Sequence, residues 1–261
     1  MSKTYSIDEV GILPNSSQTL DLHLAWIDNS FRVSVCKSES NEVIYFRHYS
    51  FQQIQQFSDV LSDLKAIVSS DVLFGGNYLK VKIGISGRME LTPKEFFKAE
   101  ENSISGKLSN GEIVGSITPD NSEIEFYGAF FADTEFELLP LKWLEQIFPQ
   151  GNAKKLFVQI DGNLLHIARF SEANKLQFYN TFEFKTFEDF AYFTNLVAES
   201  LELNRAETEL VLSGDVAQPS KVYDAAFTYF QTVSFLQNNA VAYSALFSTY
   251  PKHQNIALFS L

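Results

Sequence analysis

The sequence predicts an α/β protein made of two related lobes, each a mixed five-stranded sheet with helices. The first observation is an internal repeat: without a gap, Ser38–Asn41 aligns with Ser171–Asn174 further along the chain. The second is a shared order of elements, because both copies show three strands, a helix and a fourth strand. The third is that this fourth strand ends in Ser-Gly in both copies, at Ser86-Gly87 and at Ser213-Gly214. We therefore interpret the chain as an internal duplication.

The composition limits the classes of function. Hydrophobic residues make up 45% and aromatic residues 15% of the chain, which predicts sizeable cores and a globular protein. A formal net charge of -12 would repel nucleic acid and anionic lipid headgroups, so we expect neither as a partner. Cys36 is the single cysteine, which excludes an intramolecular disulfide and suits a reducing compartment. No apolar run approaches the ~20 residues of a membrane span. We expect a cytoplasmic protein without membrane insertion.

The first lobe is expected to span residues 20–149, after a polar N-terminal arm over residues 1–19 that frays. Alternating apolar residues separated by turn residues predict three hairpin-connected strands. The helical spacing of apolar residues from Ile54 to Val68 predicts a helix equivalent to one from Phe187 to Leu201. The same alignment pairs Leu24–Ile27 with Phe157–Ile160 as core strands. The expected elements are strands at 20–27, 31–37, 43–49 and 78–86 and a helix at 52–68.

The rest of the first lobe has weaker signals. Thr92-Pro93 fits the start of a helix, because proline at the first helical position loses no hydrogen bond. Residues 100–122 are rich in Ser, Gly and Asn and are interpreted as an insertion. This insertion either forms a small hairpin through 112–117 or is a mobile segment with a binding role. A fifth strand is expected at 124–131 and a closing helix at 138–148.

The second lobe is expected to span residues 150–261 and to repeat the plan. Thr186 and Asp189 have the spacing of a capping box, which places the start of the main helix. The apolar tail at 256–259 is expected to dock on the core. The expected elements are strands at 155–161, 164–170, 176–182, 209–213 and 232–236 and helices at 186–203, 221–230 and 240–248.

This repeated plan, with a tight turn after the first strand of each copy, resembles the actin-like ATPase superfamily, which includes actin, DnaK-type chaperones and sugar kinases and has ribonuclease H-like lobes. In that superfamily both turns carry an Asp-x-Gly-type phosphate motif, and a later strand of the second half ends in a Gly-Gly adenosine motif. The chain, including Phe178–Phe182 with Leu212–Asp215, also resembles an uncharacterised Bacteroidetes family with an actin-like fold and no established activity. Matched by position, the nucleotide-binding candidates are Asp28, Asn29 and Ser30, then Asp161, Gly162 and Asn163, and then Ser213 and Gly214.

Two interpretations of these positions are open. In the first, Asp28 and Asp161 hold Mg²⁺ through water while backbone N–H groups of the turns bind the phosphates of ATP. In the second, Asp-Asn and Asp-Gly are the dipeptides that tolerate positive φ in a two-residue hairpin, and Gly214 meets a steric need of its turn. No catalytic residue and no metal site is predicted, because neither histidine spacing nor a nucleophile motif supports one.

All three motifs depart from the superfamily pattern: the first turn lacks glycine, the second has it in the wrong place, and the third has Gly214 alone. Our leading hypothesis is therefore a pseudoenzyme, a protein-interaction or scaffold module without a cofactor, with a protein as its partner. The alternative is a divergent ATP-binding protein that holds Mg²⁺-ATP in the interlobe cleft. A third hypothesis is an enzyme that acts on another ligand in that cleft.

Overall fold

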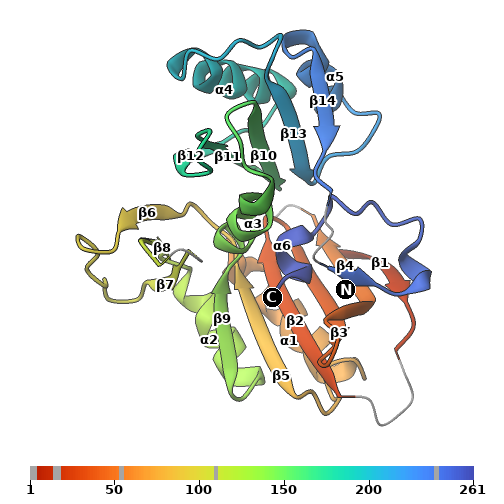
Figure 1. The fold of residues 1–261 in the computed structure, drawn as a ribbon. Helices are drawn as coiled ribbons and strands as arrows, with labels where there is room; N and C mark the ends of the chain where they lie inside the picture. The colour runs from red at the N-terminus through yellow and green to blue at the C-terminus, as the bar shows by residue number, and fades with distance from the viewer. Residues whose placement is uncertain (1–4, 14–18, 53–55, 109–110, 238–240) are drawn as a thin grey trace.

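The computed structural model describes residues 5–13, 19–52, 56–108, 111–237 and 241–261. Two sheets form two lobes, and the helix α3 (Leu139–Ile147) lies where the lobes meet (Figure 1). In the described part of the chain, no helix is both long enough and apolar enough to cross a membrane.

The sheet of the first lobe has the strand order β1-β4-β3-β2-β5-β9, and β15 also pairs with β4. The β2, β3 and β4 strands form an antiparallel meander, while β5 and β9 are parallel to β2. The meander and the β5 strand were predicted from the sequence. The strands are β1 (Tyr5–Gly11), β2 (Leu20–Ile27), β3 (Ser30–Lys37), β4 (Glu42–Phe51), β5 (Lys80–Ile85), β9 (Thr134–Leu138) and β15 (Ala242–Tyr243).

The sheet of the second lobe repeats this plan. Its order, β12-β11-β10-β13-β14, matches β4-β3-β2-β5-β9 strand by strand. As in the first lobe, the first three strands are antiparallel and the last two are parallel to the first. The predicted duplication of a mixed five-stranded sheet is thus confirmed. The strands are β10 (Lys155–Asp161), β11 (Leu164–Phe170), β12 (Leu176–Glu183), β13 (Glu209–Gly214) and β14 (Thr232–Phe235).

Both ends of the chain join the first lobe. The expectation of a frayed arm is wrong for residues 5–11, because β1 pairs with β4 along its whole length. Pro14 to Ser17 of that arm lie outside the described residues. The helix expected at 240–248 is also wrong: β15 pairs with β4, and a 3₁₀ turn, η3 (Ala245–Phe247), follows it, with residue 240 outside the described part. The last helix, α6 (Ile256–Phe259), is buried, as the apolar tail predicted, and the core that it joins is that of the first lobe.

The first helix starts later than its apolar spacing predicts. Helical structure begins with a 3₁₀ turn, η1 (Phe57–Asp59), where the Asp59 carboxylate accepts a hydrogen bond from the Gln56 N–H group. The α-helix α1 covers only Leu61–Ser70, and Ile54 lies outside the described residues.

The segment after β5 forms a small sheet of its own. Thr92 and Pro93 belong to the strand β6 (Glu90–Pro93) and not to a helix, and Pro93 suits the end of an edge strand because it has no N–H group to pair. The strands β7 (Ile104–Lys107) and β8 (Ile113–Ile117) form a hairpin, so of the two alternatives for the insertion the structure has the hairpin. This sheet has the order β6-β8-β7.

Residues 121–130 form the helix α2 (Asn121–Phe130), so the strand expected at 124–131 is wrong. Asp120 caps this helix, and its side chain accepts a hydrogen bond from the Ser122 N–H group. Glu123, Phe126 and Tyr127 are buried with the three- and four-residue spacing of a helix face. The fifth strand of the lobe is β9, which follows the helix.

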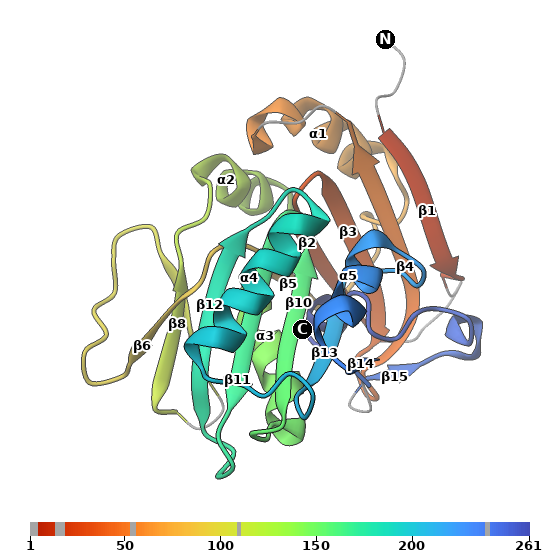
Figure 2. The same cartoon turned by 90° about the horizontal axis from the view of Figure 1, so that it is seen from above.

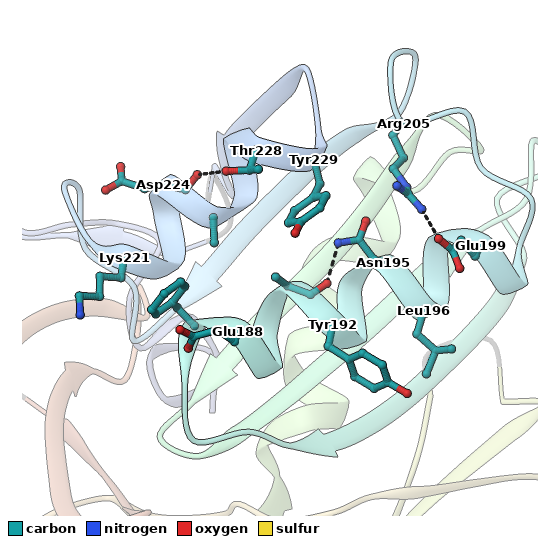
Figure 3. A pocket seen from close by; sticks show the side chains of 13 residues that line it. Glu188, Tyr192, Asn195, Leu196, Glu199, Arg205, Lys221, Asp224, Thr228 and Tyr229 are labelled. Carbon is teal, nitrogen blue, oxygen red and sulfur yellow. Dashed lines mark hydrogen bonds and ion pairs between the residues drawn. The ribbon is translucent and has the colours of Figure 1, made fainter.

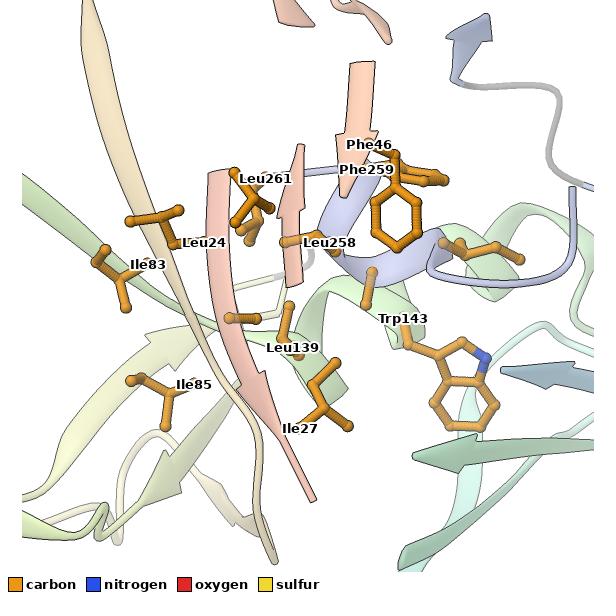
Figure 4. Close-up of a cluster of buried hydrophobic side chains, with 14 of the residues drawn as sticks. Leu24, Ile27, Phe46, Ile83, Ile85, Leu139, Trp143, Leu258, Phe259 and Leu261 are labelled. Atoms are coloured by element: carbon orange, nitrogen blue, oxygen red, sulfur yellow. The ribbon is translucent and has the colours of Figure 1, made fainter. Parts of the chain in front are cut away.

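The helices α3 and α6 fill the space on one side of the first sheet (Figure 4). Trp143 on α3 is fully buried, and its indole N–H donates to the Ser213 Oγ of the second lobe at 3.1 Å. The helices α4 (Phe187–Ser200) and α5 (Lys221–Tyr229) cover the outer face of the second sheet, which is the face away from α3 (Figure 2). The predicted capping box at Thr186 and Asp189 is confirmed at the start of α4.

Candidate functional site

The two predicted phosphate turns are the hairpin turns between β2 and β3 and between β10 and β11. Ile27 pairs with Ser30 across the first hairpin, and Asp161 pairs with Leu164 across the second. Each turn therefore has two residues, and Asp161 is the last residue of a strand and not part of its turn. By this pairing Ile27, and not Asp28, is the counterpart of Asp161.

The turn residues give the same correspondence. Asp28 (φ 52°) and Gly162 (φ 59°) are the first turn residues, and both are in the left-handed region. The next residues, Asn29 and Asn163, each accept a hydrogen bond at 2.9 Å through the backbone carbonyl, from the N–H groups of Phe51 and Phe184. Positive φ in a hairpin is a conformation that Asp, Asn and Gly tolerate, so the local geometry needs no ligand to explain these residues.

The sequence alignment was wrong by one residue in the first two strands of each lobe. Cys36 pairs with Val43 in the first lobe, whereas Phe170 pairs with Leu176 in the second, so the second-lobe connection is one residue shorter. The pairing of Leu24–Ile27 with Phe157–Ile160 is therefore displaced. A displacement of one residue in a strand exchanges the two faces of the sheet.

Asp161 lies at the end of β10, on the face of the second sheet that packs toward α3 and the first lobe, and it is close to Asp215 and Arg32. Its side chain is buried and accepts a hydrogen bond from Gln159 Nε2 at 2.7 Å, and its Oδ2 lies 3.6 Å from His166 Nε2. Burial, followed by the charge of Asp215, raises the pKa of Asp161 to about 6. Burial lowers the pKa of His166 to about 3, so the imidazole is neutral at pH 7 and the contact is not an ion pair.

Ser213 and Gly214 are accounted for by packing at the end of β13. The Ser213 hydroxyl accepts from Trp143 and donates to the Val158 carbonyl oxygen at 3.2 Å, so its hydrogen bonds are made inside the protein. Gly214 has φ 84°, and a Cβ added there would lie 2.0 Å from the Ile160 carbonyl oxygen. Only glycine fits this close approach of two backbones.

A buried ion pair between the lobes was not predicted from the sequence. Arg32 on β3 is 4% exposed and makes two parallel hydrogen bonds to Asp215 after β13, from Nη1 to Oδ1 at 3.0 Å and from Nη2 to Oδ2 at 2.6 Å. Arg32 also donates to Ser30 Oγ at 3.0 Å and to Asn255 Oδ1 at 2.7 Å. The Gly162 N–H of the second turn donates to Asp215 Oδ2 at 3.1 Å. We refer to Arg32, Asp215 and the Gly162 amide as the interlobe clasp.

Electrostatics keep both members of the ion pair charged. Burial alone would lower the pKa of Arg32, but the neighbouring Asp215 carboxylate raises it. Burial alone would raise the pKa of Asp215, but the Arg32 guanidinium and the Gly162 N–H lower it below its usual value. The two shifts agree in direction, since each favours the ionised form.

The two turns also touch each other. A Cβ added to Gly162 would lie 2.1 Å from the Cβ of Asp28, so there is no room for a phosphate group between the turns. Next to the clasp is a cavity of about 410 Å³, whose walls include Arg32, Asp215 and the first turn. The Asp215 carboxylate in this wall would repel a phosphate, and Arg32 already has its partner there.

The residues present do not fit the Mg²⁺-nucleotide that the superfamily resemblance implies. Among the residues that the structure describes, no group of three or more His, Cys, Asp or Glu is placed to hold a metal ion. Magnesium requires near-octahedral oxygen ligands, and the carboxylate of Asp161, one of its two expected partners, is buried and in contact with Gln159 and His166.

Comparison with known proteins gives the family. A family model described as "Protein of unknown function (DUF3822)" matches residues 13–112 and 121–233, so the chain belongs to this family. A Bacteroides thetaiotaomicron protein described as having an actin-like ATPase fold and unknown function is similar with a TM-score of 0.72 and 20% identity, over 87% of this chain and 93% of that one. The ethanolamine utilization protein EutJ from Carboxydothermus hydrogenoformans gives a TM-score of 0.52 and 8% identity, over 87% of this chain and 86% of that one. No curated protein matches the sequence. The expected actin-like ATPase fold is confirmed.

Proposed function

We propose that this chain is a non-catalytic actin-like protein that acts in the cytoplasm as a protein-interaction module. The observation that carries this proposal is an open apolar groove between α4 and α5 on the outer face of the second lobe (Figure 3). The interlobe clasp supports the non-catalytic part. A nucleotide would have to separate the two turns and break the Arg32–Asp215 pair, and breaking a buried ion pair costs about 3–5 kcal/mol. Because the Asp215 side chain is 32% exposed, we expect the lower part of that range.

The groove has a volume of about 770 Å³. Its floor is formed by small and apolar side chains of both helices, such as Ala191 and Ala225, and its walls carry larger ones. Tyr192 is 61% exposed, and Leu196 and Tyr229 are also exposed. Exposed aromatic side chains that flank an apolar groove are typical of sites that receive the apolar face of a partner helix.

The charges around the groove indicate the chemistry of the partner. Glu199 is paired with Arg205 at 2.7 Å, and the Lys221 amino group lies over the Phe187 ring at 5.5 Å. Glu188 and Asp224 also line the groove, near the start of each helix. With a net charge of -12, a second copy of this chain would be repelled. The groove therefore fits a partner helix with an apolar face and flanking Lys or Arg residues.

The test uses variants of the groove that leave the fold intact. We expect a double variant, Tyr192→Ser with Leu196→Ser, to lose a partner that the wild-type protein captures from its host. Phe227→Ser is the matched control, because Phe227 is 47% exposed on α5 but does not line the groove. A peptide covering the basic apolar helix of that partner should then bind the wild type at least ten-fold more tightly than the double variant. Equal binding by the double variant, or an acidic binding segment, would contradict the proposal.

A further inference from the structure

A second cavity, of about 560 Å³, lies on the first lobe and shares only Asp28 and Asn29 with the cavity next to the clasp. It is formed by the first hairpin turn, the η1 turn, the residues after β5 and the connection from β8 to α2. Asn163 extends into its lining from the second lobe. A cavity of this volume has the size of a small-molecule site.

Glu123 is the unusual residue in this lining. It is 6% exposed, and its Oε1 is fully buried without a hydrogen-bond partner among the described residues. No contact made by the described residues supplies a donor to either oxygen of its carboxyl group. Buried polar side chains in proteins are nearly always hydrogen-bonded, so this one points to a donor that a ligand supplies.

The other residues of the lining indicate which kind of hydrogen-bond donor the ligand carries. Asp28 and Asp120 contribute two more carboxyl groups from the first turn and from the start of α2. Among the described residues of the lining, Arg88 is the one cationic side chain, and Glu183 of the second lobe holds it at the edge, with Nη2 and Oε1 3.3 Å apart. Its charge is therefore offset from outside the cavity, and the net charge of the lining is negative.

Two aromatic rings complete the cavity. Trp26 and Phe57 meet edge to face, with ring centroids 5.4 Å apart and an interplanar angle of 90°, and both line the space. Aromatic faces together with carboxylates recognise ammonium groups, through cation–π attraction and charge-assisted hydrogen bonds. The described lining does not include three metal-ligating side chains arranged around one point, which excludes a metal cluster of those residues.

We infer that this cavity binds a small organic cation with a primary ammonium group. The ammonium group donates a hydrogen bond to the carboxylate of Glu123. The inference concerns a site separate from the α4–α5 groove and does not depend on the proposed function. The aliphatic part of such a ligand lies against Trp26 and Phe57, while Asp28 and Asp120 add to the attraction.

The protonation state of Glu123 makes binding depend on pH in a way that simple attraction to surface charges would not. Burial, followed by the charge of Asp120, raises the pKa of Glu123 to about 8, so the free protein holds this carboxyl group largely protonated at pH 7. The other ionisable groups around it are Asp120 and Asp28 in the lining, Arg88 at the edge and Tyr127 on the next turn of α2. An ammonium group favours the carboxylate, so binding releases a proton and tightens as the pH rises from 7 to 8.5.

Isothermal titration with putrescine, the 1,4-diammonium ion, tests the proposal on the full chain. We expect saturable binding, proton release detected by comparing two buffers of different ionisation enthalpy, and at least ten-fold weaker binding by Glu123→Gln. Glu95→Gln, which removes an exposed carboxylate outside the cavity, is the matched control and should bind like wild type. A melting curve of each variant checks that it is folded. We expect Asp28→Asn to weaken putrescine binding as well, but by less than Glu123→Gln does.

Three outcomes would overturn the proposal. One is the absence of saturable binding at millimolar putrescine. Another is equal binding by Glu123→Gln and the wild type. The last is equal affinity for neutral 1,4-butanediol, which would mean that the cavity does not recognise positive charge.

Discussion

Arg32 forms a buried ion pair with Asp215 across the interface between the lobes. Asp215→Asn removes its partner and leaves a guanidinium that is 4% exposed without a counter-charge. Because Asp215 itself is partly exposed, we expect a loss of about 3 kcal/mol in the free energy of unfolding, measured by urea denaturation. Asp224→Asn, an exposed acid on α5, is the control and should change stability by less than about 0.5 kcal/mol. A loss of similar size in both variants would mean that the clasp does not stabilise the interlobe contact.

Glu123 should make stability depend on pH between the unfolded and folded pKa values of its carboxyl group. Its folded pKa of about 8 is above the ordinary value of 4.5, so folding favours the protonated carboxyl group. The contribution is fully present below pH ~4.5 and is lost as the pH rises through 8, by up to about 1.4 kcal/mol per pH unit. Glu123→Gln stays neutral, so its stability relative to wild type should rise between pH 6 and pH 9. Parallel curves of unfolding free energy against pH for the two proteins would contradict this assignment.

For single residues, the sequence predicted the turn positions better than it predicted which side chains form ion pairs. Asp28 and Gly162 were identified as turn residues from local backbone preferences, and the structure has them at positive φ. Arg32 and Asp215 are 183 residues apart, and local spacing carries no information about such a contact. One signal was available: an arginine between Phe31 and Val33 in a buried strand needs a distant partner. The sequence could not show which acid that partner is.

The hairpin of β7 and β8 is an element whose packing can be tested. Ile117 is 4% exposed in β8, so Ile117→Ala should lower the free energy of unfolding by about 2–4 kcal/mol. Ser105→Ala on the exposed side of β7 should change it by less than about 0.5 kcal/mol. Chemical denaturation of both variants measures the difference. If neither variant changes stability, the segment behaves as a surface loop that can be shortened freely, as its composition suggested.

The elements were predicted well where the periodicity agreed with a boundary signal, which is a turn for a strand and a capping box for a helix. The meander strands and α4 have both, and they form at the expected residues. The helix α2 was mistaken for a strand, although Glu123, Phe126 and Phe130 follow Asp120 with helical spacing. A run of aromatic residues has high strand propensity, and tertiary packing overrode that preference. The strand β15 could not be predicted, because two residues carry no periodicity and their pairing with β4 comes from the other end of the chain.

The whole molecule shows why a repeat alone does not locate a site. The duplication correctly predicted two lobes of the same plan, and the strand orders of the two sheets match. The alignment still misplaced Asp161, because a connection that is one residue shorter moved the first two strands of the second lobe by one position. Register is set by which face is buried, and only the packed lobes determine that. The C-terminal segment likewise belongs to the core of the first lobe, which no local feature of residues 241–261 indicated.

We propose that the chain has the actin-like fold but that its interlobe cleft does not bind Mg²⁺-ATP. Thermal unfolding with and without millimolar Mg²⁺-ATP tests it most directly, because a ligand bound only by the folded state stabilises it by about 2.7 kcal/mol at a hundred times Kd. For a chain of this size that corresponds to a rise in Tm of roughly 5–10 °C. We predict no change in Tm beyond experimental error. An ATP-dependent rise of that size in the wild type, absent in Asp28→Asn, would contradict the claim.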